Sequence, residues 1–192
     1  MSTPLQLDPS HTALVVIDLQ RGIASTQTVP HAASDVIARS ARLATAFRQH
    51  RAPVILVNVD PGPDGSLMPR PTADQPRPPM TFPPEWSELV PELGAEASDI
   101  RITKHQPNAF YMTKLDDVLR AHNIRTIVLT GISTNIGVEA TARAAHERRF
   151  DTVFAEDAMA ARDAELHQVS TTKFFPTIGR VRSTDAIIAA LA

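Results

Sequence analysis

Short apolar runs alternate along this chain with segments of helical periodicity. Continuous apolar runs occupy residues 13–19 (ALVVIDL) and 53–59 (PVILVNV), and such runs are typical of strands buried on both faces of a parallel sheet. The segment between them has apolar residues at helical spacing, namely Val36, Ile37, Leu43, Ala44 and Phe47. Together these segments predict a first β-α-β unit.

The same alternation continues to the end of the chain. Further strands are predicted at residues 100–103, 126–131, 151–157 and 178–183. Four more helices are predicted between these strands and after the last of them. The first is marked by Leu115, Val118 and Leu119, and the second covers residues 135–148. The third has Asp163 as its N-cap, and the last is capped by Ser183 or Thr184. Six strands that alternate with helices predict an open, doubly wound α/β sheet.

One region interrupts the alternation. Residues 61–91 contain ten of the sixteen prolines, a density that excludes long helices and central strands. A loop of this length is usually a lid, a binding loop or an oligomer contact, although a surface spacer without a role is equally compatible. Trp86 favours an interface, but a lone tryptophan among prolines more often packs such a loop onto the body of the domain than it contacts a ligand.

Composition narrows the functional classes. A chain of 192 residues with 43% hydrophobic residues fits one globular domain, here residues 1–192. The longest apolar run is far too short to span a membrane, and the N-terminal residues lack the regions of a signal peptide, so we expect a cytoplasmic protein. The net charge is −2 and the basic residues are scattered. We therefore expect a small-molecule substrate and neither a nucleic-acid nor a membrane partner.

The chain contains no cysteine. This excludes disulfides, thiolate metal sites and thiol nucleophiles.

Three chemically suggestive positions lie at or just beyond the ends of predicted strands, where doubly wound sheets bind ligands. They are Asp18, Lys104 and Gly137. Asp18 is either a buried acid or base or a cap for the following loop, and Lys104 in isolation would be a surface lysine. If the two lie side by side, the lysine should lower the pKa of the Asp18 carboxyl and favour its ionised form.

Three segments resemble the signature segments of the isochorismatase-like hydrolase superfamily, also called the cysteine hydrolases. They are ALVVIDLQRGI, KHQPNAF and LTGISTNIGVEATARAAHERRFDTVFAEDA, and the similarity extends over residues 13–183. The resemblance implies a three-layer α/β/α sandwich with a six-stranded parallel sheet, and a homo-oligomer of two or more copies. It also implies that Asp18 is the catalytic acid/base and Lys104 its catalytic lysine.

The chain departs from the family pattern at Gly137, because the third catalytic residue is normally a cysteine in GxxTxxC. A thiol-based acyl-enzyme is therefore impossible. Isochorismatases proper also resemble this chain in having glycine there, and they act directly on a vinyl ether. By this resemblance Asp18, as a carboxylic acid, would protonate the enol ether carbon, and water would capture the oxocarbenium ion.

The resulting prediction is a hydrolase that acts without a thiol on a vinyl ether or a related small substrate. Another enol ether or an activated ester is equally compatible. The alternative is a catalytically silent family member that acts as a binding or interaction protein. The retained Asp18 and Lys104 argue against this alternative, although a structural ion pair could also retain both.

Five residues of the signature segments are candidates for the substrate pocket, namely Gln20, Gln106, Phe110, Asn135 and Ile136. True isochorismatases resemble this chain in spacing but carry arginine where it has Gln106, which argues against isochorismate itself because glutamine supplies no charge for a dianion. Gln106 could instead stabilise its loop, and Phe110 could equally pack in the core.

The turn GISTNIG has a further implied role. The family typically has a cis peptide at the position of Ile132–Ser133 and uses the backbone N–H groups of Ser133 and Gly137 to hold an oxyanion. Backbone donors at a helix N-terminus stabilise negative charge whatever side chain they carry.

We expect neither a metal nor an organic cofactor. The metal-binding relatives, the nicotinamidases, carry an aspartate and histidines after the second strand, whereas Asp60 here has no histidine near it in the sequence. The seven histidines, His105 and His167 among them, show no ligand spacing of the HExxH kind and are interpreted as surface or packing residues. His105 adjoins Lys104 and is the histidine most open to another role.

Overall fold

A computed structural model describes residues 4–75 and 80–191. Its centre is a single six-stranded sheet in which every pair of neighbouring strands is parallel. The strands are β1 (Thr12–Ile17), β2 (Val54–Val59), β3 (Ile100–Lys104), β4 (Thr126–Ile132), β5 (Asp151–Ala160) and β6 (Arg180–Arg182), in the order β3-β2-β1-β4-β5-β6. All six predicted strands are confirmed, and β5 runs further than predicted.

The helices lie between the strands as the periodicity predicts. They are α1 (Arg21–Ala24), α2 (Ala33–Gln49), α3 (Leu115–Ala121), α4 (Glu139–Glu147), α5 (Ala164–Val169), α6 (Phe175–Ile178) and α7 (Thr184–Ala190). Short 3-10 turns occupy Pro9–His11, Pro84–Ser87 and Pro91–Leu93, and π-helical turns occupy Thr134–Val138 and Ser170–Phe174. The predicted helix over residues 135–148 is thus a π-helical turn followed by α4.

The predicted N-caps are confirmed. The side chain of Asp163 accepts hydrogen bonds from the backbone N–H groups of Glu165 and Leu166 at the start of α5. At the start of α7 the cap is Ser183 rather than Thr184, because the Ser183 hydroxyl accepts from the backbone N–H of Ala186.

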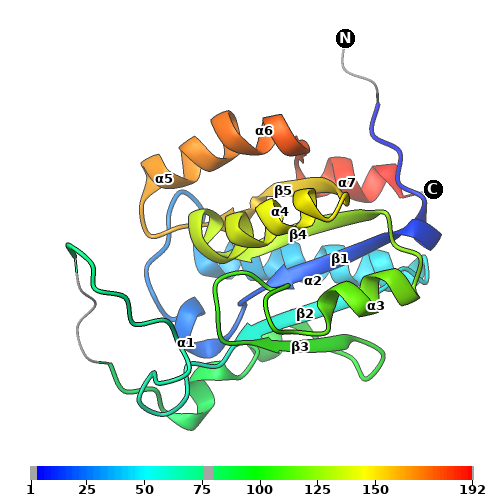
Figure 1. Cartoon of the computed structure of the whole chain (residues 1–192). Helices are drawn as coiled ribbons and strands as arrows, with labels where there is room; N and C mark the ends of the chain where they lie inside the picture. Colours follow the sequence, from blue (N-terminus) through cyan, green and yellow to red (C-terminus); the bar gives the residue numbers. More distant parts are fainter. Residues whose placement is uncertain (1–3, 76–79, 192) are drawn as a thin grey trace.

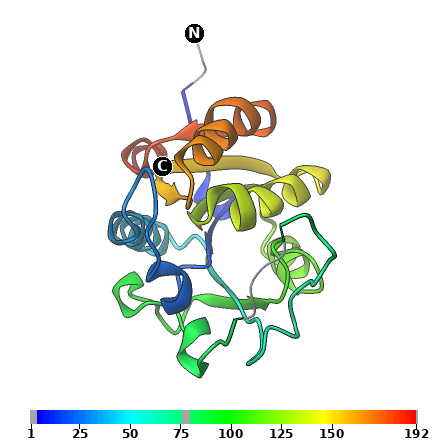
Figure 2. The same cartoon turned by 90° about the vertical axis from the view of Figure 1, so that its left-hand side faces the viewer.

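Helices cover both faces of the sheet, which gives the predicted three-layer α/β/α sandwich (Figures 1 and 2). Strand β1 is buried along its whole length, and its residues alternate between the two layers. Leu14 and Val16 belong to the core beneath α2 and α7, whereas Val15 and Ile17 belong to the core beneath α3, α4 and α6.

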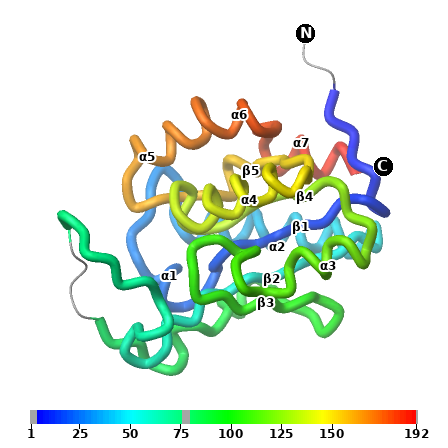
Figure 3. Tube along the Cα trace, viewed as in Figure 1, coloured from blue at the N-terminus to red at the C-terminus, as the bar shows by residue number. Residues whose placement is uncertain are grey.

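The strand order reverses between β1 and β4, so these central strands form the topological switch point of the sheet. Their carboxyl ends lie side by side, with Ile17 paired to Gly131. Gly131 has a φ of +123°, and a Cβ there would overlap the backbone oxygen of Ile17, so this position requires glycine. The first and last described segments, drawn in blue and red, lie at the opposite end of the sheet (Figure 3).

The proline-rich loop projects from the same end of the molecule as the carboxyl ends of the strands (Figure 1). Its residues 76–79 lie outside the described part of the chain. The Trp86 ring lies against Gly22 of α1, where it leaves no room for a Cβ, and its centroid is 4.9 Å from that of Phe82. The tryptophan therefore packs the loop onto the body of the domain.

Among the described residues, no helix combines the length and the apolar character that crossing a membrane requires.

Candidate active site

Asp18 lies directly after β1, at the switch point of the sheet. It is 4% exposed and has a φ of +57°, a left-handed conformation that aspartate tolerates better than most residues. Its Oδ2 accepts a hydrogen bond of 2.8 Å from Nζ of Lys104. Its Oδ1 is buried, and within the described residues it has no hydrogen-bond partner.

Lys104 is the last residue of β3, and its side chain reaches Asp18 from two strands away with only 1% of its surface exposed. The structure brings together these two residues, which lie 86 positions apart and whose proximity the sequence left open.

Burial raises the pKa of the Asp18 carboxyl to about 6 from an ordinary 3.8, because it removes water from the charged form. The charge of Lys104 and its hydrogen bond lower the pKa but only partly offset burial. The lysine thus lowers the pKa of Asp18 as expected, but burial, which the sequence pattern does not show, has the larger effect. A carboxyl group with this pKa exists in both protonation states near neutral pH, as acid–base catalysis requires.

Gly137 faces this pair from the π-helical turn Thr134–Val138. A Cβ at Gly137 would lie 3.0 Å from Oδ2 of Asp18, 3.7 Å from Nζ of Lys104 and 2.9 Å from Cγ2 of Ile17. The φ of Gly137 lies outside the left-handed region, so the backbone conformation does not require glycine. Glycine instead allows the close approach of this turn to Ile17 and to the carboxyl group, where a side chain would be crowded.

The turn that holds Gly137 begins with the predicted cis peptide between Ile132 and Ser133, which is confirmed. Ser133 is the N-cap of the turn, so the backbone N–H groups of its first residues lie at the start of a helical segment that continues as α4. Of the pocket candidates in this turn, Asn135 is partly exposed and Ile136 is 45% exposed.

The other pocket candidates lie in different surroundings. Gln20 is fully buried, and its amide donates to the backbone oxygens of Val59 and Trp86 and accepts from the backbone N–H of Val59. Its side chain thus fixes the end of β2 and the proline-rich loop. Phe110 is buried in the core, with its ring centroid 5.9 Å from that of Phe150, which is the packing role considered above.

Gln106 and His105 follow Lys104 directly in the chain. Gln106 is partly exposed at the carboxyl end of β3. His105 contacts the backbone oxygen of Asp60 through Nδ1 at 2.7 Å, so its ring joins the segments that follow β2 and β3.

Two surface cavities of about 440 and 670 Å³ lie away from Asp18. The first lies beside Arg101 and residues 88–95, and the second lies at the amino ends of β4 and β5, opposite to the switch point. The Asp18–Lys104 pair is instead almost closed to water, and this strengthens its electrostatic interactions.

Sequence reasoning missed one group of side chains near the end of β5. Nε2 of His31 and Nε2 of His167 lie 3.3 and 3.1 Å from Oε1 of Glu156. Hydrogen bonding from His167, followed by that from His31, lowers the pKa of the Glu156 carboxyl. Positions 31 and 156 are 125 residues apart and form no spacing motif, so the sequence carries no signal for this group.

The protein is thus an α/β protein with a polar site at the carboxyl ends of its strands. Its sheet is doubly wound, and a buried carboxylate–lysine pair lies at the switch point. Residues 12–186 match the Isochorismatase domain, and the chain therefore belongs to the isochorismatase family.

Comparison with individual proteins agrees with this membership. The chain is 47% identical over 187 residues to the uncharacterized isochorismatase family protein YecD of Escherichia coli O157:H7, with 97% of this chain and 100% of that protein covered. It is 33% identical to the ureidoacrylate amidohydrolase RutB of Methylobacterium radiotolerans, with 98% and 82% covered. A solved isochorismatase family protein from Burkholderia thailandensis superposes with a TM-score of 0.93 at 42% identity and covers 98% of this chain and 99% of its own.

Proposed function

We propose that this protein is a small-molecule hydrolase that acts without a thiol nucleophile on a vinyl ether or a related small substrate. Membership of the isochorismatase family and similarity to an amidohydrolase support hydrolysis as the reaction class. The absence of cysteine from the chain supports a mechanism without an acyl-thioester intermediate.

The observation that carries the proposal is the state of the Asp18 carboxyl group. Lys104 binds Oδ2, while Oδ1 is buried and lacks a hydrogen-bond partner among the described residues. A buried polar atom without a partner is unfavourable in a merely structural role. A proton on Oδ1 would thus be available to a substrate, and the pKa of about 6 makes the protonated form accessible near neutral pH.

In the proposed reaction Asp18 transfers its proton from Oδ1 to the terminal carbon of the enol ether. The carbon–carbon double bond becomes single, and the positive charge is shared by the other alkene carbon and the ether oxygen. Water adds to that carbon, and the resulting hemiketal breaks its bond to the ether oxygen. One proton of the added water restores the Asp18 acid, and the other passes to the departing ether oxygen as the hydroxyl group becomes the carbonyl, so the products are an alcohol and a carbonyl compound.

The neighbouring groups have supporting roles in this proposal. Lys104 holds Oδ2, so the carboxyl group is fixed and its ionised form after proton transfer is stabilised. The missing side chain of Gly137 lets the backbone of its turn approach the carboxyl group closely, and the backbone N–H groups of Ser133 and Gly137 serve a negatively charged group of the substrate. Gln106, Asn135 and Ile136 are the proposed pocket residues.

One observation also suits the alternative of a catalytically silent binding or interaction protein. The 2.8 Å contact between Asp18 and Lys104 could be a purely structural buried ion pair. Turnover separates the two functions, because a structural pair requires no chemistry.

The test is a substrate screen over enol ethers, activated esters and amides. The wild-type chain is compared with Asp18→Asn, and Asp117→Asn, at an exposed position of α3, is the matched control. We expect turnover of an enol ether, a loss of roughly 10²- to 10⁴-fold in Asp18→Asn, and no loss in the control. Equal activity of Asp18→Asn would refute the site, and turnover of no class would favour the silent alternative.

Running the reaction in D₂O tests the chemical step. Proton transfer to carbon should leave one deuterium on the new methyl or methylene group of the carbonyl product, as detected by mass spectrometry. Hydrolysis without deuterium at carbon would contradict protonation by Asp18 and indicate attack at an acyl group.

A further inference from the structure

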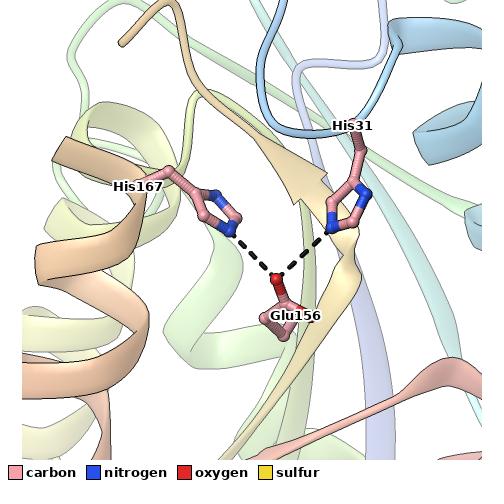
Figure 4. A group of neighbouring side chains, drawn as sticks. All are labelled: His31, Glu156 and His167. Carbon is pink, nitrogen blue, oxygen red and sulfur yellow. Dashed lines mark hydrogen bonds and ion pairs between the residues drawn. The ribbon is translucent and has the colours of Figure 1, made fainter. Parts of the chain in front are cut away.

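A group of three side chains lies outside the proposed catalytic pair. His31 precedes α2, Glu156 lies in β5 and His167 lies in α5. Both imidazole rings point their Nε2 atoms at the Glu156 carboxylate, as Figure 4 shows. The three atoms that face one another lie within 4.8 Å of each other.

The separations fit a metal ion as well as they fit a carboxylate that accepts two hydrogen bonds. A tetrahedral zinc ion with bonds of about 2.0–2.1 Å holds neighbouring ligand atoms ~3.3–3.4 Å apart. The Nε2 atoms of His31 and His167 lie 3.3 and 3.1 Å from Oε1 of Glu156. Both histidines approach the same oxygen, so three potential ligand atoms surround one point in space.

The donor types favour a particular class of ion. Two imidazole nitrogens and one carboxylate oxygen are the ligands of several catalytic zinc sites, whereas Mg²⁺ and Ca²⁺ prefer oxygen ligands. The His167 side chain is 4% exposed, while those of His31 and Glu156 are 25% and 37% exposed. An ion could therefore enter from the side of His31 and Glu156 and keep a water molecule as its fourth ligand.

The surrounding structure holds the potential ligands in place. The other ring nitrogen of His167, Nδ1, lies 2.8 Å from the hydroxyl of the buried Thr134, an arrangement typical of metal-binding histidines. With a metal on Nε2, Nδ1–H donates to that hydroxyl. The Thr28 hydroxyl donates to the backbone oxygen of His31, and two backbone hydrogen bonds join Val29 to Ala161 at the end of β5.

We propose that His31, Glu156 and His167 bind a divalent transition-metal ion of the zinc type. This site does not depend on the proposed hydrolase function. Thr134 belongs to the same turn as Gly137, so an ion at this site would restrain the turn through His167.

The test uses tag-free, metal-stripped protein titrated with Co²⁺, whose visible absorption reports coordination, and with Zn²⁺ in competition. We expect saturation at one ion per chain, displacement of Co²⁺ by Zn²⁺, and no displacement by millimolar Mg²⁺ or Ca²⁺. His31→Ala and His167→Ala should weaken binding by more than the roughly 10- to 100-fold that loss of an orienting partner causes, and Thr134→Val by about that amount.

The matched control is His146→Ala, at an exposed histidine of α4, which should bind like the wild type. Thermal unfolding of each metal-free variant shows whether it has folded, and Glu156→Gln provides a second ligand variant of nearly unchanged size. The absence of saturable binding, or wild-type affinity in folded His31→Ala and Glu156→Gln, would overturn the proposal and leave the three residues as a hydrogen-bonded structural group.

Discussion

The buried carboxyl group of Asp18 makes the stability of the fold depend on pH in an unusual direction. Its pKa is about 6 in the folded protein and near the ordinary 3.8 when the chain unfolds. Between these values the folded state holds a proton that the unfolded state has lost, so the free energy of unfolding falls as the pH rises. The contribution of this group is fully present below about pH 4 and is lost as the pH passes through 6.

The magnitude follows from the two pKa values. Each unit of difference corresponds to ~1.4 kcal/mol, so the rise from 3.8 to about 6 amounts to about 3 kcal/mol. For a chain of 192 residues this corresponds to a decrease in Tm of roughly 6–12 °C between pH 4 and pH 7. Carboxylates with lowered pKa values, such as Glu156, act in the opposite sense, since they destabilise the fold as the pH falls.

The assay isolates Asp18 by comparison with Asp18→Asn. Asparagine has almost the same size and also tolerates a positive φ, so the backbone is preserved. We expect the stability of the wild type relative to this variant, measured by urea unfolding, to fall by about 3 kcal/mol from pH 4 to pH 7. Asp117→Asn should show no such trend. A difference that stays constant or rises with pH would show that the ion pair with Lys104 outweighs burial.

Three further predictions concern the surroundings of Asp18. Lys104→Met should move the pH midpoint of the Asp18 contribution upward, because the lysine lowers the carboxyl pKa, and a downward shift in the same urea experiments would contradict the contact. Gly137→Cys should give a thiol that iodoacetamide alkylates rapidly near pH 6–7. Lys104 and the start of the helix favour the thiolate, so they should lower the pKa of the thiol from an ordinary value of about 8.5. Slow labelling would show that the opposing charge of Asp18 dominates or that the thiol is inaccessible. The protein should form a homo-oligomer at micromolar concentration, as light scattering can determine, and a monomer mass would refute this expectation.

Much of the fold could be predicted because buried parallel strands read as continuous apolar runs. The end of β5 was missed because Glu156 and Asp157 interrupt its apolar run. The register of β4 against β5 shifts between Leu129 and Gly131, and β5 continues beyond the two carboxylates to Ala160. Asp157 accepts hydrogen bonds from Thr184 at the start of α7. These carboxylates thus have partners that only the tertiary structure brings near.

The candidate site could be predicted in its composition but not in its energetics. Asp18 and Lys104 lie at the carboxyl ends of β1 and β3, so the fold class places both at one edge of the sheet, and the length of the lysine side chain allows the contact. The pKa of Asp18 depends on how completely folding removes water from its carboxyl group, and no sequence pattern reports how deeply that group is buried. The group of His31, Glu156 and His167 depends on how a loop and α5 converge on β5, which a spacing motif cannot reveal.

The central claim, that protonated Asp18 is the catalytic acid, is tested most directly by the pH dependence of kcat/KM on a substrate found in the screen. We predict that kcat/KM is level below about pH 6 and falls tenfold for each further pH unit, because the carboxyl group must carry its proton. A rate that instead rises through pH 6 to a plateau at higher pH would show that the ionised carboxylate is the active form and would contradict the account.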